Sequence, residues 1–205
     1  MTISPQLLAI TSGLGIGLAT IAAIGPQNAF VLRQGLRGEH VAPVVAICVV
    51  SDVVLIAVVV AGAGAILDAA PWAVDLIRWT GAAYLAGYGL LAARRALRPA
   101  TLQTSMEDSG RLRPTVVTTL ALTWLNPHVY VDTVLLLGPT AAAHGIHRWA
   151  FAAGAVLAST LWFIGIGTGA RLLRPAFARP GTWHLLDGTV AVVMIALAVA
   201  LVRGI

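Results

Sequence analysis

An apolar segment from residue 7 to residue 36 contains an unusual run, Ile24-Gly25-Pro26-Gln27-Asn28-Ala29-Phe30-Val31-Leu32-Arg33-Gln34-Gly35. The segment is long enough to cross a bilayer as a helix, which takes about 20 residues. Pro26 has no N–H group and its ring clashes with the carbonyl of Ala22, so the helix must kink or stop there. Backbone groups freed in hydrocarbon are tolerated only where protein or a water-filled cavity covers them. The run therefore indicates a broken helix that lines a binding site, with a purely structural proline kink as the alternative.

A second break of the same kind follows 101 residues later, in the run Leu125-Asn126-Pro127-His128-Val129-Tyr130-Val131-Asp132. It lies near the middle of the apolar segment 115–137. Asn126 suits an N-cap, and Pro127 suits the first position of a helix. We therefore expect each run to end one half-helix and to start another.

Both runs resemble the signatures of the LysE/ArgO family of lysine and arginine exporters. The similarity rests on residues 25–31 with Gln34-Gly35, and on residues 125–130 with Asp132-Thr133. It covers the whole chain, because the length, the six apolar segments and the positions of both runs agree. The resemblance implies a membrane transporter, not an enzyme, that exports basic amino acids. The direction of transport is implied by the resemblance alone.

The composition indicates a polytopic membrane protein. Of the 205 residues, 59% are hydrophobic and only 10% are charged, and the mean hydropathy is +0.89, whereas a soluble domain carries about 25% charged residues. All 13 basic residues are arginine. Because they cluster between the apolar segments, we interpret them as orientation signals and expect no nucleic-acid partner. The single cysteine, Cys48, excludes an intramolecular disulfide and is expected to be a packing residue.

Six segments are predicted to cross the membrane, at 5–30, 42–66, 72–93, 115–138, 146–170 and 185–203. The first, third and fifth connections carry two, five and three arginines, against three in the rest of the chain. Because arginine-rich connections stay on the cytoplasmic side, we predict a multi-pass protein of the bacterial cytoplasmic membrane with both termini outside. The polar stretch 94–114 is predicted to be a cytoplasmic linker.

The two halves, 1–93 and 115–205, show an internal repeat within one integral membrane domain. The matched positions are Pro26 with Pro127, Ser51-Asp52 with Ser159-Thr160, and Gly81 with Gly188. Three crossings per half would place the second half upside down. The predicted fold is thus an all-α polytopic membrane protein, with six transmembrane helices in two inverted three-helix repeats and with helices 1 and 4 broken at the two prolines. Chance similarity between two alanine- and leucine-rich halves is the alternative.

Two carboxylates are predicted to lie deep in the membrane. Asp52 is flanked by valines in the second segment, and Asp132 follows Pro127 by five residues. A charged group at the bilayer centre costs at least about 2.5 kcal/mol and is by default a functional candidate. The alternative for each is a structural partner of an arginine or of an exposed backbone group. Asp187, at the start of the last segment, is expected to be structural.

Together these residues suit an amino acid. A half-helix that starts after Gly25 offers N–H groups and a positive dipole end to a carboxylate. The half-helix before the break offers carbonyl groups to an ammonium, and the two deep carboxylates offer negative charge to a cationic side chain. The predicted substrate-binding residues are Gly25, Pro26, Gln27, Asn28, Asp52, Asn126, Pro127, His128 and Asp132.

Proton coupling follows from the absence of arginine deep in the predicted segments. Without a permanent cationic partner, a deep carboxylate needs a transient cation or a bound proton. Each carboxylate is therefore expected to hold a proton while the site is empty and to release it as substrate binds. His128, whose imidazole changes charge near neutral pH, could relay a proton or could be a neutral histidine bonded to the backbone. The proton-coupling candidates are Asp52, His128 and Asp132, and the membrane potential is the alternative driving force.

Other functions remain open at this point. A divalent-metal exporter for a cation such as Mn²⁺ could use Asp52, Asp132, His128 and Asn28 as ligands, although the sequence offers only two deep carboxylates. An exporter of neutral amino acids is a further alternative. A membrane-embedded enzyme is disfavoured, because the chain has no His-Glu-x-x-His, Gly-x-Ser-x-Gly or Cys-x-x-Cys motif. We expect no cofactor and no resident metal, with a basic amino acid and membrane lipid as partners and with a homo-oligomer left open.

Overall fold

The computed structural model describes residues 4–22, 25–63, 71–97, 111–124, 126–177 and 180–203, and every secondary-structure element in these ranges is helical. The first half of the chain contains α1 Pro5–Ile21, α2 Pro26–Arg37, α3 Val41–Val58, the π-helical turn η1 Val59–Ala63, and α5 Pro71–Leu97. The second half contains α6 Leu112–Trp124, α7 Pro127–Tyr130, the π-helix η2 Val131–Leu137, α8 Gly138–Ala143, η3 Gly145–His147, α9 Arg148–Gly169, η4 Ala170–Leu173, α10 Arg174–Phe177 and α11 Pro180–Arg203.

Proline sets where many of these helices begin. It is the first residue of α1, α2, α5, α7 and α11, where its missing N–H group costs nothing because that group has no partner inside a helix. Ser4 caps α1 by accepting a hydrogen bond from the N–H group of Leu7 at 3.3 Å. Gly38 ends α2 in the left-handed conformation, at a φ of 76°, which glycine adopts without steric cost. The local sequence thus fixes both ends of α2.

The described residues form a helical membrane protein. Two continuous helical stretches, Val41–Gly62 and Gly145–Leu173, are long and apolar enough to cross a bilayer, with mean hydropathies of 3.0 and 1.8. A third crossing is possible if α1 and α2, which meet at 84°, form one broken span. Within α11, residues His184–Ala200 form a shorter apolar helical stretch.

The helix bounds correct several sequence-based boundaries. The second half of the first broken helix was expected to end near residue 30, but it continues to Arg37 and so places Arg33 and Arg37 inside α2 rather than in a loop. The polar linker predicted at 94–114 is shorter at both ends, because α5 continues to Leu97 and α6 begins at Leu112. Residues 98–110, which make up the rest of that linker, lie outside the described ranges. Hydropathy sets the ends of a predicted membrane span, whereas a capping residue such as Gly38 sets the end of the helix itself.

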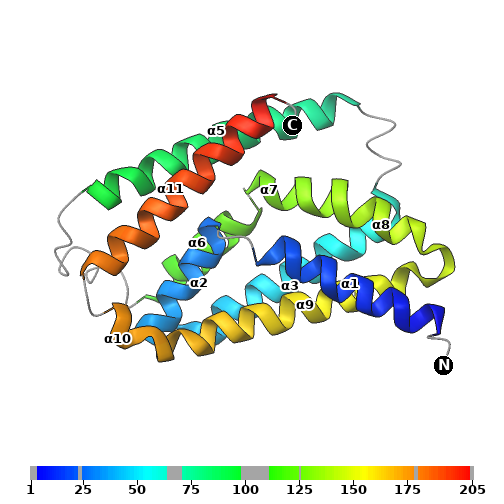
Figure 1. Cartoon of the computed structure of the whole chain (residues 1–205), viewed down its shortest axis with the longest axis horizontal. Coiled ribbons are helices and arrows are strands. Elements are labelled where there is room, and N and C mark those ends of the chain that lie inside the picture. Colours follow the sequence, from blue (N-terminus) through cyan, green and yellow to red (C-terminus); the bar gives the residue numbers. More distant parts are fainter. Residues whose placement is uncertain are drawn as a thin grey trace.

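The half-helices lie between two pairs of long helices. Figure 1 shows α5 and α11 side by side along one edge of the molecule. Along the opposite edge, α1 and α3 both pack against α9. Between them lie α2, α6 and α7, the three short helices that border the proline breaks. The ends of α2 and α5, the start of α6 and α10 all lie at the left end in Figure 1, while the start of α1 and α8 lie toward the right.

Glycine allows α1 and α9 to pack closely. A Cβ atom added at Gly13 would overlap the carbonyl oxygen of Phe151, and one added at Gly154 would overlap the carbonyl oxygen of Ile10. The contact is therefore reciprocal, with a glycine of each helix facing the backbone of the other. Small residues of this kind let helices approach in lipid, where no hydrophobic force drives them together. The close packing of α1 against α9 therefore holds the first half of the broken helix in place.

We predict that Gly13→Ala lowers the melting temperature of the detergent-solubilised protein. The added methyl group has to displace the backbone of α9, and such overpacking costs about 1–3 kcal/mol. Gly15→Ala is the matched control, because a Cβ atom at Gly15 meets nothing within 4 Å. Equal melting temperatures for the two variants would contradict the close packing of α1 and α9.

Candidate functional site

One cavity lies where the two helix breaks meet. Its volume is about 80 Å³, which leaves room for several water molecules, since each needs roughly 10–15 Å³ by this measure. Its polar lining comes from Thr20, Gly25, Gln27, Asn28, Asp52, Asn126 and Thr133. Its apolar lining comes from Ile21, Leu55, Ile56, Val129, Leu137 and Phe163.

Five of the predicted substrate-binding residues border this cavity together. Gly25, Gln27 and Asn28 come from the first break, Asn126 comes from the second, and Asp52 comes from the middle of α3. Pro26 is buried at the start of α2, next to them in the chain. The backbones of Pro127, His128 and Asp132 are helical, in α7 and η2, but their side chains lie outside the described part of the structure.

The first break is closed by Asn28. Its Nδ2 atom donates a hydrogen bond of 2.7 Å to the carbonyl of Ile21, the last residue of α1. Its Oδ1 atom accepts a hydrogen bond of 3.2 Å from the indole N–H of Trp162 in α9. Sequence analysis expected Asn28 to contact substrate directly. That contact stays a prediction, whereas the observed bonds of the amide tie the two half-helices together and anchor them to α9.

The second break is closed in the same manner. The hydroxyl of Tyr130, in α7, donates a hydrogen bond of 2.8 Å to the carbonyl of Trp124, the last residue of α6. In both breaks, a side chain of the following half-helix satisfies a carbonyl freed at the end of the preceding one. This matters in hydrocarbon, where an unsatisfied backbone group costs several kcal/mol.

Asp52 is held by a hydroxyl rather than by a cation. The hydroxyl of Ser159, in α9, donates a hydrogen bond of 2.6 Å to its Oδ2 atom. Among the side chains that the structure describes, Asp52 forms no ion pair; the single ion pair among them joins Arg33 to Asp187. The carboxyl group therefore lies at the cavity wall, bonded to a neutral hydroxyl group.

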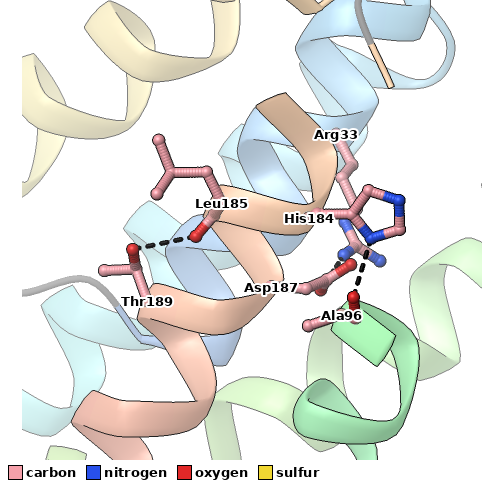
Figure 2. Close-up of polar contacts among 6 residues, drawn as sticks. All are labelled: Arg33, Ala96, His184, Leu185, Asp187 and Thr189. Carbon is pink, nitrogen blue, oxygen red and sulfur yellow. Dashed lines mark hydrogen bonds and ion pairs between the residues drawn. The ribbon is translucent and has the colours of Figure 1, made fainter. Parts of the chain in front are cut away.

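The Arg33–Asp187 pair forms a separate polar cluster away from the cavity. Figure 2 shows Asp187 of α11 pointing at Arg33 of α2, while the imidazole of His184 is directed at the end of α5. The ion pair measures 2.5 Å, and His184 Nδ1 donates to the carbonyl of Ala96 at 2.8 Å. Asp187 is only 8% exposed. These contacts tie α2, α5 and α11 together, in keeping with the structural role expected of Asp187.

Several residues at the site were missed by the sequence analysis. Trp162 and Ser159 are the partners of Asn28 and Asp52, and Thr20 and Thr133 add hydroxyl groups to the cavity wall. The repeat offered one signal, because it matched Ser159 with Ser51, the neighbour of Asp52 in the chain. For Trp162 the sequence offers no signal of its own, since the contact joins residues 134 positions apart.

Comparisons with known proteins identify the class and then the family. A helical membrane protein with a polar cavity at two broken helices has the construction of a transporter. The family model for LysE type translocators matches residues 18–204, and the chain belongs to that family. No solved structure matches the chain.

Three curated relatives illustrate the family. A predicted amino-acid transporter of Mycobacterium tuberculosis is 50% identical over 177 residues, which cover 86% of this chain and 88% of the relative. The lysine exporter LysE of Corynebacterium efficiens is 38% identical, with 93% of this chain and 96% of the relative covered. The arginine exporter ArgO of Salmonella enteritidis is also 38% identical, with coverages of 93% and 92%.

We predict that Tyr130→Phe destabilises the protein. The ring stays, but the carbonyl of Trp124 loses its donor, and leaving such a group unsatisfied costs about 1–3 kcal/mol. The melting temperature should fall for Tyr130→Phe and stay near that of the wild type for Tyr84→Phe. Tyr84 is the matched control because its ring stacks on Tyr88 and would keep doing so. If Tyr130→Phe melts at the wild-type temperature, its hydroxyl does not close the second break.

Proposed function

We propose that the protein is a secondary transporter that exports basic L-amino acids, arginine, lysine or both, across the bacterial cytoplasmic membrane. One observation carries the proposal: residues of both helix breaks and the carboxylate of Asp52 border a single cavity. The names of the LysE and ArgO relatives support it, because both are exporters of basic amino acids.

Each part of a basic amino acid has a counterpart in the cavity wall. The first turn of α2 directs N–H groups and the positive end of the helix dipole at the break, which suits an α-carboxylate. Asp52 suits the cationic end of the side chain, and Asn126 offers a neutral amide. The apolar wall formed by Leu55, Ile56 and Phe163 suits the methylene groups between the two charges. His128 and Asp132 are proposed to complete the site from the second break.

The cavity must widen to hold a whole arginine. Ligand sites commonly enclose 300–1,000 Å³, whereas this cavity measures about 80 Å³. One wall is formed by Thr133 and Leu137 of the π-helix η2. π-Helical segments are rare and occur often at functional sites. We therefore propose that the structure represents a closed state and that η2 is the wall that moves.

An inverted repeat of six membrane-spanning helices, divided into 1–93 and 115–205 by the linker, is part of the proposal. Ser51-Asp52 and Ser159-Thr160 were matched as equivalent positions, and Asp52 is in fact hydrogen bonded to Ser159. The two matched dipeptides are therefore in contact, as expected of segments near the axis that relates two repeats. The ends of α2 and α5, the start of α6 and α10 carry most of the described arginines and lie at the left end in Figure 1. We propose that this end faces the cytoplasm, with both termini outside and lipid on the outer apolar faces.

Export is proposed to be coupled to protons through Asp52, with Asp132 and His128 as further candidates. A carboxylate in a membrane site is costly while it is charged and unpaired. A proton can neutralise Asp52 in the empty site and leave when the cationic substrate arrives. The exchange would move one positive charge in each direction across the membrane.

We predict that Asp52→Asn lowers arginine efflux while the protein remains folded in the membrane. Losing a charge-assisted contact of about 1.5–3 kcal/mol weakens binding by roughly 10- to 100-fold. Efflux of labelled L-arginine and L-leucine from preloaded cells that lack their own exporters gives the measurement. Glu39→Gln is the matched control, because Glu39 is exposed beyond the end of α2.

Two outcomes would count against this assignment. Wild-type efflux of arginine by Asp52→Asn, over a range of external pH, would make the carboxylate structural. Efflux of leucine but not of arginine by the wild-type protein would replace the basic substrate with a neutral one.

A further inference from the structure

Two buried amides on α2 have atoms without hydrogen-bond partners among the described residues. They are Gln27, whose Nε2 atom is unpartnered, and Gln34, whose Oε1 atom is unpartnered. The two residues are only 8% and 5% exposed. They are seven positions apart in the sequence, so they lie on nearly the same face of the helix, about 10 Å apart along its axis. Leaving such atoms unpaired costs about 1–3 kcal/mol each, which a purely structural amide would avoid.

A row of threonines runs along α6 in the same way. Thr115, Thr119 and Thr123 are spaced four residues apart and are 5%, 1% and 0% exposed. Each hydroxyl donates to a carbonyl one turn earlier, at 3.2, 2.7 and 2.9 Å respectively. Each oxygen can still accept a hydrogen bond. The opposite face of α6 is apolar and exposed, at Val117 and Leu120, so the polar row faces the protein interior.

The two polar rows approach each other beside Cys48, next to the cavity. The thiol of Cys48 in α3 lies beside both Gln27 and Thr123, and Gln27 itself lines the cavity. In Figure 1, α2 and α6 lie next to each other, with the end of α2 and the start of α6 both at the left end of the molecule. Gln34 and Thr115 therefore lie toward that arginine-rich end, while Gln27 and Thr123 lie toward the cavity. We call Gln27, Gln34, Thr115, Thr119 and Thr123 the α2–α6 seam.

We propose that the α2–α6 seam is the closed passage between the cavity and the arginine-rich end, and that Gln34 is a transient contact for the polar groups of the substrate. The proposal rests on the proposed function, since it concerns the route of the same amino acid. When α2 and α6 separate, the seam offers amide and hydroxyl groups to a charged amino acid that has shed water. When they close, the Oε1 atom of Gln34 is left without a hydrogen-bond partner among the described residues, as observed. The strain of the closed seam thus favours reopening.

Gln34→Leu separates this role from a structural one. The substitution keeps most of the volume and removes the unpartnered amide. We expect it to leave the melting temperature unchanged or raised, to leave the affinity for L-arginine of the purified protein within about twofold, and to lower the maximal efflux rate from proteoliposomes at least about tenfold, which is the effect of about 1.4 kcal/mol. Thr119→Val should also slow efflux. Its matched control is Thr189→Val, because Thr189 makes the same bond to a carbonyl one turn earlier but is exposed on α11.

Three results would contradict the proposed role of the α2–α6 seam as a passage. The first is efflux by Gln34→Leu at the wild-type rate. The second is a joint fall in melting temperature, affinity and efflux, which would make Gln34 a packing residue. The third is equal slowing by Thr119→Val and Thr189→Val.

A substrate-independent test distinguishes failure of the seam from failure of the proposed function. Cys48 is the only cysteine in the chain, so Thr119→Cys in a Cys48→Ala background carries a single thiol. A small membrane-impermeant thiol reagent, added from the arginine-rich side, should label it faster than Thr189→Cys. Labelling together with an absence of arginine binding by the wild-type protein would reject the proposed substrate and keep the passage. If Thr119→Cys reacts no faster than Thr189→Cys, the passage is wrong whatever the substrate is.

Discussion

A polypeptide backbone in hydrocarbon has to satisfy its own hydrogen-bonding groups, and both proline breaks violate that requirement locally. Two side chains, Asn28 and Tyr130, compensate for this. Each donates a hydrogen bond to the carbonyl group at the end of the preceding half-helix. Because these bonds cover the freed carbonyls, the chain can expose helix ends and amides to a cavity in the middle of an apolar protein. The polar site thus depends on the way in which the breaks are closed.

The surrounding helices hold the breaks in place. The close α1–α9 contact at Gly13 and Gly154 fixes the first half-helix, and Trp162 of the same α9 holds Asn28. Ser159, one turn earlier in α9, holds Asp52. On the other side, the Arg33–Asp187 ion pair ties α2 to the α5–α11 pair. One long helix, α9, therefore positions both the break and the carboxylate.

The sequence was enough to predict what local chemistry controls. The half-helix starts at Pro26 and Pro127 follow from the geometry of proline, and the helical membrane class follows from composition. The placement of Asp52 beside the breaks followed from the cost of a charge in lipid. The partners that Asn28, Asp52 and Arg33 have on distant helices could not be predicted, because these contacts join residues 107 to 154 positions apart. The length of α2 was underestimated because its last turns, from Leu32 to Arg37, are polar enough to look like a loop.

We propose that one cavity binds both charged groups of a basic amino acid: the start of α2 binds the α-carboxylate, and Asp52 binds the cationic side chain. The most direct test compares the binding of arginine, citrulline and agmatine to the purified wild-type protein and to Asp52→Asn. Citrulline lacks the cationic side chain and agmatine lacks the carboxylate. The wild type should bind arginine at least about tenfold more tightly than either analogue. In Asp52→Asn, the preference over citrulline should disappear while the preference over agmatine remains. An unchanged preference for arginine over citrulline in Asp52→Asn would contradict the account.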